Sequence, residues 1–189
     1  MDGPAHEVFP GVLFLGGIKH SGKSTLGRLL SEASGLPFYD GDDLTVSAAR
    51  RREIEVSTAR ELYRIAGPEG FKHYEAEALL EVVGPGRMVL ALGGGAIDNP
   101  AALEVVDRNG YLVYLHVDAD ILYERVMRSG TPAFLTSDDP YEEFLALSRR
   151  RDAAYRNKAY LVIELTGLGV REAFEKTHRV IRRQIPGWQ

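Results

Sequence analysis

The residues most able to do chemistry lie in a glycine-rich segment near the amino terminus that matches the pattern G-x-x-x-x-G-K-[ST]. Glycines let backbone N–H groups turn inward around phosphate oxygens, and a helix that begins there adds partial positive charge. The lysine of this pattern reaches the β and γ phosphates of a nucleotide, and the hydroxyl after it can ligate Mg²⁺. The residues that we predict to bind nucleotide are Gly17, Lys19, Ser21, Gly22, Lys23, Ser24 and Thr25, with Lys23 also catalytic.

A second chemical signal is the acidic segment Asp40-Gly41-Asp42-Asp43, which follows a short apolar run. At the carboxyl end of a parallel strand, carboxylates face the ligand site. One carboxylate can hold Mg²⁺, and another can bind an acceptor hydroxyl and take its proton. We favour such roles for Asp40 and Asp42, whereas we expect Asp43 to be the N-cap of the next helix.

A third signal is the triplet Gly93-Gly94-Gly95, which follows another apolar run. Three glycines at the end of a strand let the backbone approach a ligand closely and offer free N–H donors. A flexible connection to the helix that begins at Pro100 is the alternative. Because the triplet falls at the same predicted sheet edge as the other two signals, we favour a ligand contact.

The elements that must position these residues alternate along the chain. Apolar runs that read as strands cover 12–15, 37–39, 88–92, 111–115 and 160–165, and helical patterns cover 23–33, about 43–83, 100–109, 119–127, 140–157 and 170–185. Several runs are apolar at consecutive positions, which is typical of strands buried on both faces. The alternation predicts an α/β fold in which a parallel sheet lies between two layers of helices. Within 43–83, Thr58 and Glu61 fit a capping box, and Gly67-Pro68 fits the end of one helix and the start of another.

The composition supports one globular domain over residues 1–189. Apolar residues make up 44% of the chain and charged residues 26%, which argues against disorder. The net charge of −4 provides no basic field for nucleic acid or an anionic membrane. The chain has no cysteine, which excludes disulfides, thiolate metal sites and a cysteine nucleophile. No apolar run is long enough to span a bilayer, so we expect a cytoplasmic protein that binds neither membrane nor nucleic acid.

Together these motifs resemble those of the shikimate kinases, in the small P-loop kinase superfamily. The resemblance covers nearly the whole chain. It rests on Asp40-x-Asp42, on the segment Leu92–Ala96, on Thr58–Tyr63 followed by Gly67–Glu75, and on Arg151-x-x-x-Tyr155. It implies a P-loop NTPase fold with a five-stranded parallel sheet and a lid at about 129–140. It also implies a kinase that transfers the γ-phosphate of ATP to a hydroxyl of a small hydroxylated carboxylic acid, with shikimate the first candidate. We further expect the kinase to use Mg²⁺ and to be a monomer.

The resemblance also implies roles for individual residues. Asp40, with Ser24, would hold the metal, and Asp42 would bind the acceptor hydroxyls and act as base. Arg151 would pair with the acceptor carboxylate through its planar guanidinium, whereas its place in the run 149–151 alone would suggest a solvated side chain. The residues implied to bind the acceptor are Asp42, Phe71, Lys72, Gly93, Gly94, Gly95 and Arg151.

The chain departs from the family pattern in four places. Lys72 stands where the family has an arginine, and His20 stands at a usual glycine position. Thr131-Pro132 stands where the family lid carries Arg-Pro, and 129–140 contains no Lys or Arg. The segment 43–58 is longer than usual and holds Arg50-Arg51-Arg52, which we interpret as a solvated helix face.

Because the predicted lid has no lysine or arginine, either another cation serves the transferring phosphate or transfer is slow. We expect Lys19 or Arg128, among candidates that also include Arg125, Arg149 and Arg150.

Two other functions remain open. The segment Tyr39–Leu44 is also similar to that of gluconate kinases, which would make another polyhydroxy acid the acceptor. A nucleotide-binding protein without turnover is the third interpretation, and the lid without arginine motivates it. Retention of Lys23, Ser24, Asp40 and Asp42 argues against that third interpretation.

Overall fold

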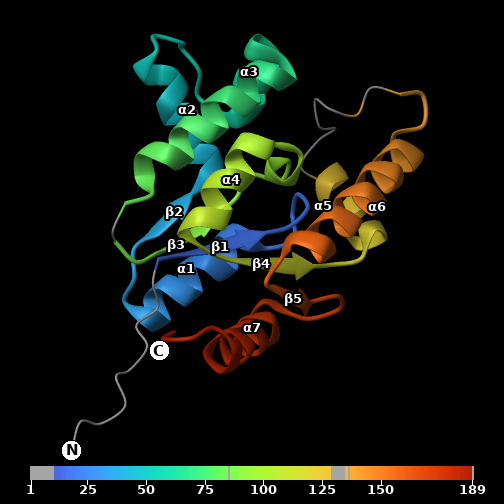
Figure 1. Ribbon diagram of the computed structural model, residues 1–189. Coiled ribbons are helices and arrows are strands. Elements are labelled where there is room, and N and C mark those ends of the chain that lie inside the picture. The colour runs from blue at the N-terminus through green and yellow to red at the C-terminus, as the bar shows by residue number, and fades with distance from the viewer. Residues whose placement is uncertain (1–10, 85, 129–134, 136, 189) are drawn as a thin grey trace, which may run out of the picture.

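The computed structural model describes residues 11–84, 86–128, 135 and 137–188, and these form one five-stranded parallel sheet covered on both faces by helices (Figure 1). The strands are β1 (Val12–Gly16), β2 (Phe38–Asp40), β3 (Met88–Ala91), β4 (Gly110–His116) and β5 (Leu161–Glu164). Their order in the sheet is β2-β3-β1-β4-β5. The predicted α/β class and the five parallel strands are confirmed, and each strand end lies within one residue of the predicted one.

The central strand is the most deeply buried part of the sheet. Val12, Leu13, Phe14 and Leu15 of β1 have no exposed surface, as the run of consecutive apolar residues predicts for a strand covered on both faces. By contrast, β5 at the edge alternates between buried and exposed residues. The three strands β2, β3 and β1 are neighbours, so their carboxyl ends bring the three sequence motifs to one edge.

Two helical layers cover this sheet. The helices are α1 (Lys23–Ser34), α2 (Gly41–Arg51), α3 (Ala59–Val82), α4 (Pro100–Asn109), α5 (Ala119–Arg128), α6 (Pro140–Lys158) and α7 (Val170–Gln184), with a short 3₁₀ turn η1 (Ala96–Asp98). Apolar side chains of α1, α5 and α7 share one core cluster with Leu13, Leu15 and Val113. On the other face, α3, α4 and Tyr155 of α6 pack with Phe14, Leu90 and Leu112.

The long helical region predicted over about 43–83 is two helices that pack against each other. The first, α2, begins earlier than expected, at Gly41, and ends at Arg51. The second, α3, begins after Thr58, whose side chain and Glu61 form the predicted capping box. Gly67 has φ 68°, ψ 179° inside α3, so the helix breaks there and resumes at Pro68, as the Gly-Pro pair predicts.

The helix cap after β2 differs from the expectation. We expected Asp43 to cap the helix, but Asp40 does so, and its Oδ1 accepts a hydrogen bond from the Asp42 backbone N–H at 3.1 Å. The reason is that β2 runs directly into α2, so the last strand residue is already the N-cap. Asp42 and Asp43 therefore lie in the first turn of α2, where acidic residues are favoured.

The predicted lid at 129–140 lies mostly outside the described residues. Of this segment the structure describes only Leu135 and residues 137–140, and α6 begins at Pro140. In the described part of the chain, no helix has the length and apolar character that crossing a membrane requires.

Candidate active site

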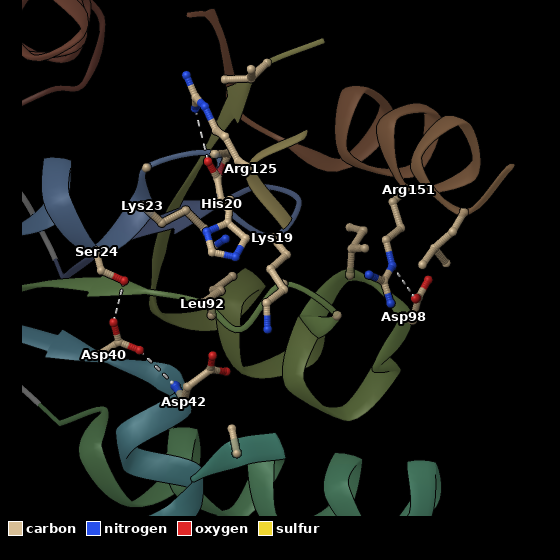
Figure 2. A pocket seen from close by; sticks show the side chains of 18 of the residues that line it. Lys19, His20, Lys23, Ser24, Asp40, Asp42, Leu92, Asp98, Arg125 and Arg151 are labelled. Carbon is tan, nitrogen blue, oxygen red and sulfur yellow. Dashed lines mark hydrogen bonds and ion pairs between the residues drawn. The ribbon is translucent and has the colours of Figure 1, made fainter. Parts of the chain in front are cut away.

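The predicted site residues meet in one cleft at the carboxyl ends of the strands, with a cavity volume of about 1190 Å³. Figure 2 shows the phosphate-binding segment on one side of this cleft and α6 with Arg151 on the other. The predicted residues that line the cleft are Lys19, Ser21, Gly22, Lys23, Ser24, Thr25, Asp40, Asp42, Phe71, Lys72, Gly94, Gly95 and Arg151. Gly17 and Gly93 lie immediately behind this lining, in contact with Ser21 and Asp42 respectively.

The loop between β1 and α1 wraps around the Lys23 ammonium group. Lys23 donates from Nζ to the carbonyl oxygens of Gly17 at 2.9 Å and Ile18 at 3.1 Å. Its side chain is buried, and this burial lowers the pKa of Lys23 to about 8, although Asp42 and Asp40 act in the opposite direction. Gly22, the N-cap of α1, has φ 94°, so a residue with a side chain would be strained there. The loop therefore presents backbone donors and a lysine to the cleft.

Ser24 and Asp40 form the pair that we predicted to hold the metal. Ser24 donates from its hydroxyl to Asp40 Oδ2 at 2.5 Å, across the gap between α1 and the end of β2 (Figure 2). A hydroxyl and one carboxylate are hard oxygen ligands of the kind Mg²⁺ prefers, with water and phosphate oxygens filling the remaining positions. Among the described residues no group of three or more His, Cys, Asp or Glu could hold a metal. The pair thus fits an ion that arrives with a nucleotide.

Asp42 lies opposite this pair, against the glycine triplet. A Cβ atom on Gly93 would come within 2.9 Å of Asp42 Oδ1 and 2.7 Å of Glu75 Oε1, so only glycine leaves room for both carboxyl groups. The walls of the cleft shield Asp42 from bulk water and raise the pKa of its carboxyl, even though the side chain is accessible from the cleft. Lys23 opposes that shift and favours the charged form.

Glu75 of α3 is a buried carboxyl group at the floor of the cleft that sequence reasoning did not single out. Only 4% of Glu75 is exposed, and burial raises the pKa of Glu75 to about 7. Asn99 donates from Nδ2 to Glu75 Oε2 at 2.9 Å and to the Lys72 carbonyl at 2.8 Å. A signal was present, because Glu75 follows Phe71 by four residues, which puts both on one face of a helix.

The other end of the cleft holds Arg151, on α6, together with a second residue that the sequence analysis did not assign to the site. Arg151 donates from Nε to Asp98 Oδ2 at 2.8 Å, and its side chain is only 13% exposed. Arg150 contacts the same carboxylate oxygen at 3.1 Å. A Cβ on Gly95 would come within 3.2 Å of the Arg151 guanidinium, so the glycine triplet lies directly against it. Arg151 is thus a positioned cation rather than a solvated one.

Phe71 and Lys72 form part of the wall contributed by α3. Phe71 packs edge-on against Tyr63, another residue of the cleft lining, with ring centroids 5.8 Å apart. Lys72 lines the cleft, and its ammonium group pairs with Glu69 at 2.9 Å. This pairing raises the pKa of Lys72 through the hydrogen bond to Glu69.

The five cations considered for the transferring phosphate are distributed unequally. Lys19, Arg125 and Arg150 line the cleft, whereas Arg128 and Arg149 are not among its lining residues. Arg128 pairs with Glu124 at 3.5 Å, with 77% of its side chain exposed. The geometry therefore favours Lys19 over Arg128, because Arg128 lies on a solvated face of α5.

Solved structures share this architecture. Shikimate kinase from Acinetobacter baumannii, solved in complex with shikimate, has a TM-score of 0.79 and 28% identity, with 94% of this chain and 95% of that one covered. Shikimate kinase from Aquifex aeolicus, 23% identical over 91% of this chain and 96% of that one, shares the fold with a TM-score of 0.66.

Sequence relatives agree with the structural ones. Shikimate kinase from Halorhodospira halophila is 36% identical over 163 residues, which cover 86% of this chain and 89% of that protein. Shikimate kinase from Dechloromonas aromatica is 32% identical over 152 residues, 80% of each chain. The family model described as shikimate kinase matches residues 19–182. The chain therefore belongs to the shikimate kinase family, whose members are phosphotransferases that act on a hydroxyl group.

Proposed function

We propose that this protein transfers the γ-phosphate of ATP to a hydroxyl group of shikimate, with Mg²⁺ bound alongside the nucleotide. The observation that carries the proposal is the arrangement of three groups around one cleft: the Lys23–Ser24 loop, the Asp42 carboxylate and the Arg151 guanidinium. The loop suits a nucleoside triphosphate, the Asp42 carboxylate suits a hydroxyl group and the Arg151 guanidinium suits a carboxylate. An acceptor that is both hydroxylated and acidic fits Asp42 and Arg151 together.

On the nucleotide side, the phosphates would lie along the loop 17–22 and the N-terminus of α1. Lys23 would leave its carbonyl partners to contact the β and γ phosphates, which restores the charged form that burial disfavours. Ser24 and Asp40 would hold the Mg²⁺ ion, which neutralises phosphate charge. Thr25 and Ser21 complete the lining at this end.

On the acceptor side, Asp42 would accept the proton of the attacking hydroxyl. The proton moves from the acceptor oxygen to Asp42, that oxygen bonds to the γ-phosphorus, and the bond from the γ-phosphorus to ADP breaks. Arg151 would bind the acceptor carboxylate beside Gly95. Phe71 and Gly94 would contact the ring of shikimate, and Lys72 would line the outer wall of the cleft. The shikimate bound to the Acinetobacter baumannii relative supports this choice of acceptor.

The direct test is ATP turnover, measured by ADP release and by mass spectrometry of the product, with shikimate, gluconate and a panel of related polyhydroxy acids and neutral sugars. We expect shikimate to give the highest kcat/KM, and removal of Mg²⁺ to stop turnover. Preference for gluconate would identify a different acid as the acceptor, and preference for a neutral sugar would contradict the role of Arg151. Nucleotide binding with no turnover on any acceptor would favour a non-catalytic function. Size-exclusion chromatography would test the predicted monomer.

A further inference from the structure

We infer that Lys19, in the middle of the phosphate-binding loop, is the catalytic cation that stabilises the negative charge on the phosphoryl group during transfer. This inference rests on the proposed kinase function and assigns to Lys19 a role beyond nucleotide binding. Figure 2 shows its side chain extending into the cleft, toward the space between Asp42 and Arg151. That space lies between the two groups that would hold the acceptor, and Lys19 reaches it from the phosphate loop.

The backbone around Lys19 is fixed from two sides. Gly94 lies so close that a Cβ on it would come within 3.2 Å of the Lys19 backbone nitrogen and 3.4 Å of its Cα. On the other side, Arg125 donates to the carbonyl oxygen of His20 at 3.2 Å. His20 has φ 64°, a left-handed conformation that few non-glycine residues adopt. The loop is therefore held in one unusual shape that directs Lys19 into the cleft.

Other cations of the cleft are engaged elsewhere. Lys23 donates to two carbonyl oxygens of its own loop, and the nucleotide phosphates would replace these two acceptors. Arg150 and Arg151 both contact Asp98, and Lys72 contacts Glu69. Within the described parts of the chain, Lys19 has no ion-pair partner, so its ammonium group is available for a phosphate oxygen. The segment 129–140 brings no lysine or arginine of its own.

Lys19 lies between both reacting sides of the cleft. It belongs to the phosphate-binding loop, and its side chain points toward Asp42, the base that we propose (Figure 2). An ammonium group between them is placed where charge shifts from the acceptor oxygen to the leaving ADP as the phosphorus–oxygen bonds form and break.

The experiment compares Lys19→Met, which keeps the length and removes the charge, with Lys19→Arg, which restores it. Lys176→Met is the matched control, because Lys176, on α7, donates to the backbone carbonyl of Glu164 at the end of β5 and does not line the cleft. We expect Lys19→Met to lower kcat roughly 10²- to 10³-fold with little change in the dissociation constant of ATP. Lys19→Arg should recover most of that loss, and Lys176→Met should match the unmodified protein. Thermal melting confirms that each variant is folded.

An unchanged kcat in Lys19→Met would overturn the inference. If the KM for the acceptor alone rises at the same time, Lys19 contacts the acceptor carboxylate instead.

A second measurement separates this inference from the proposed function, because it needs no acceptor. ADP with aluminium fluoride and Mg²⁺ mimics the transferring phosphoryl group. We expect Lys19→Met to weaken binding of this complex at least tenfold more than it weakens binding of ADP alone. Equal weakening of both would contradict the inference even if the unmodified protein phosphorylates shikimate. If the unmodified protein does not phosphorylate shikimate, the proposed function fails while this measurement still decides the role of Lys19.

Discussion

Arg151 and Asp98 are joined by a hydrogen-bonded ion pair, 2.8 Å from Nε to Oδ2, across the end of the cleft where we place the acceptor carboxylate. The carboxylate of Asp98 accepts from Nε of the guanidinium, and the terminal nitrogen Nη2 lies beside Gly95. Asp98 thus acts as a positioning residue for Arg151. A guanidinium held in one orientation loses less entropy when it binds a carboxylate with two parallel hydrogen bonds.

The first prediction is that Asp98→Asn raises the KM for the acceptor about tenfold, while kcat and the KM for ATP change much less. Steady-state kinetics with each substrate varied in turn measures this split. Asp107→Asn is the control, because Asp107 also pairs with a cation of α6, Lys158, but does not line the cleft. A lower KM in Asp98→Asn would show that Asp98 competes with the acceptor for Arg151 instead of orienting it.

The second prediction concerns Lys23. Replacement by alanine should reduce kcat by at least ~10²-fold, because the ammonium group stabilises charge that develops on the phosphates. Rates at saturating ATP measure the effect on transfer separately from the effect on binding. Lys158→Ala, at an exposed ion pair with Asp107, provides the control. An unchanged turnover number would rule out the phosphate-loop role that we assign to Lys23.

The third prediction separates the two aspartates of the acidic segment. Asp42→Asn should remove most of the activity and leave ATP affinity nearly intact, because an amide cannot accept the hydroxyl proton. Asp40→Asn should instead weaken Mg²⁺-dependent ATP binding, since Asp40 is the partner of Ser24. Isothermal titration with and without Mg²⁺ distinguishes the two. If Asp42→Asn is the variant that loses Mg²⁺-dependent affinity, the roles of the two residues are exchanged.

How far the sequence predicts this site depends on how local each signal is. The phosphate loop, the acidic segment and the glycine triplet each follow a buried apolar run, so their meeting at one sheet edge follows from the α/β pattern alone. The Thr58–Glu61 capping box and the break at Gly67-Pro68 were also predictable, because both depend on neighbouring residues.

What the sequence did not reveal depends on contacts between distant segments. Asp98 and Arg151 are 53 positions apart, and Asp98 alone reads as a helix-start residue before Pro100. Glu75 is recognisable as a buried titratable group only in the folded chain, where it lies against Gly93 and accepts a hydrogen bond from Asn99 of another element. The strand order also depends on long-range pairing, and β2 beside β3 is not encoded in any local pattern.

The last prediction tests Glu75 through the pH dependence of stability. The pKa of Glu75 is raised from 4.5 to about 7 in the folded protein, so folding favours its protonated form. The protonated Glu75 therefore makes its full contribution to the free energy of unfolding below pH 4.5. This contribution is lost as the pH rises from 4.5 to about 7, and above that pH no further loss occurs. A shift of that size corresponds to on the order of 3 kcal/mol. Chemical denaturation of the nucleotide-free protein between pH 4.5 and 8 measures the loss.

Glu75→Gln is the decisive variant, because a glutamine oxygen can still accept the hydrogen bond from Asn99 but cannot ionise. We expect its unfolding free energy to lack most of the fall between pH 4.5 and 7, and to exceed that of the unmodified protein at pH 8. Glu124→Gln, with 68% of its side chain exposed in the unmodified protein, should keep the original pH dependence. Parallel curves for Glu75→Gln and the unmodified protein would show that Glu75 does not titrate in this range, and that solvent in the cleft keeps it ionised.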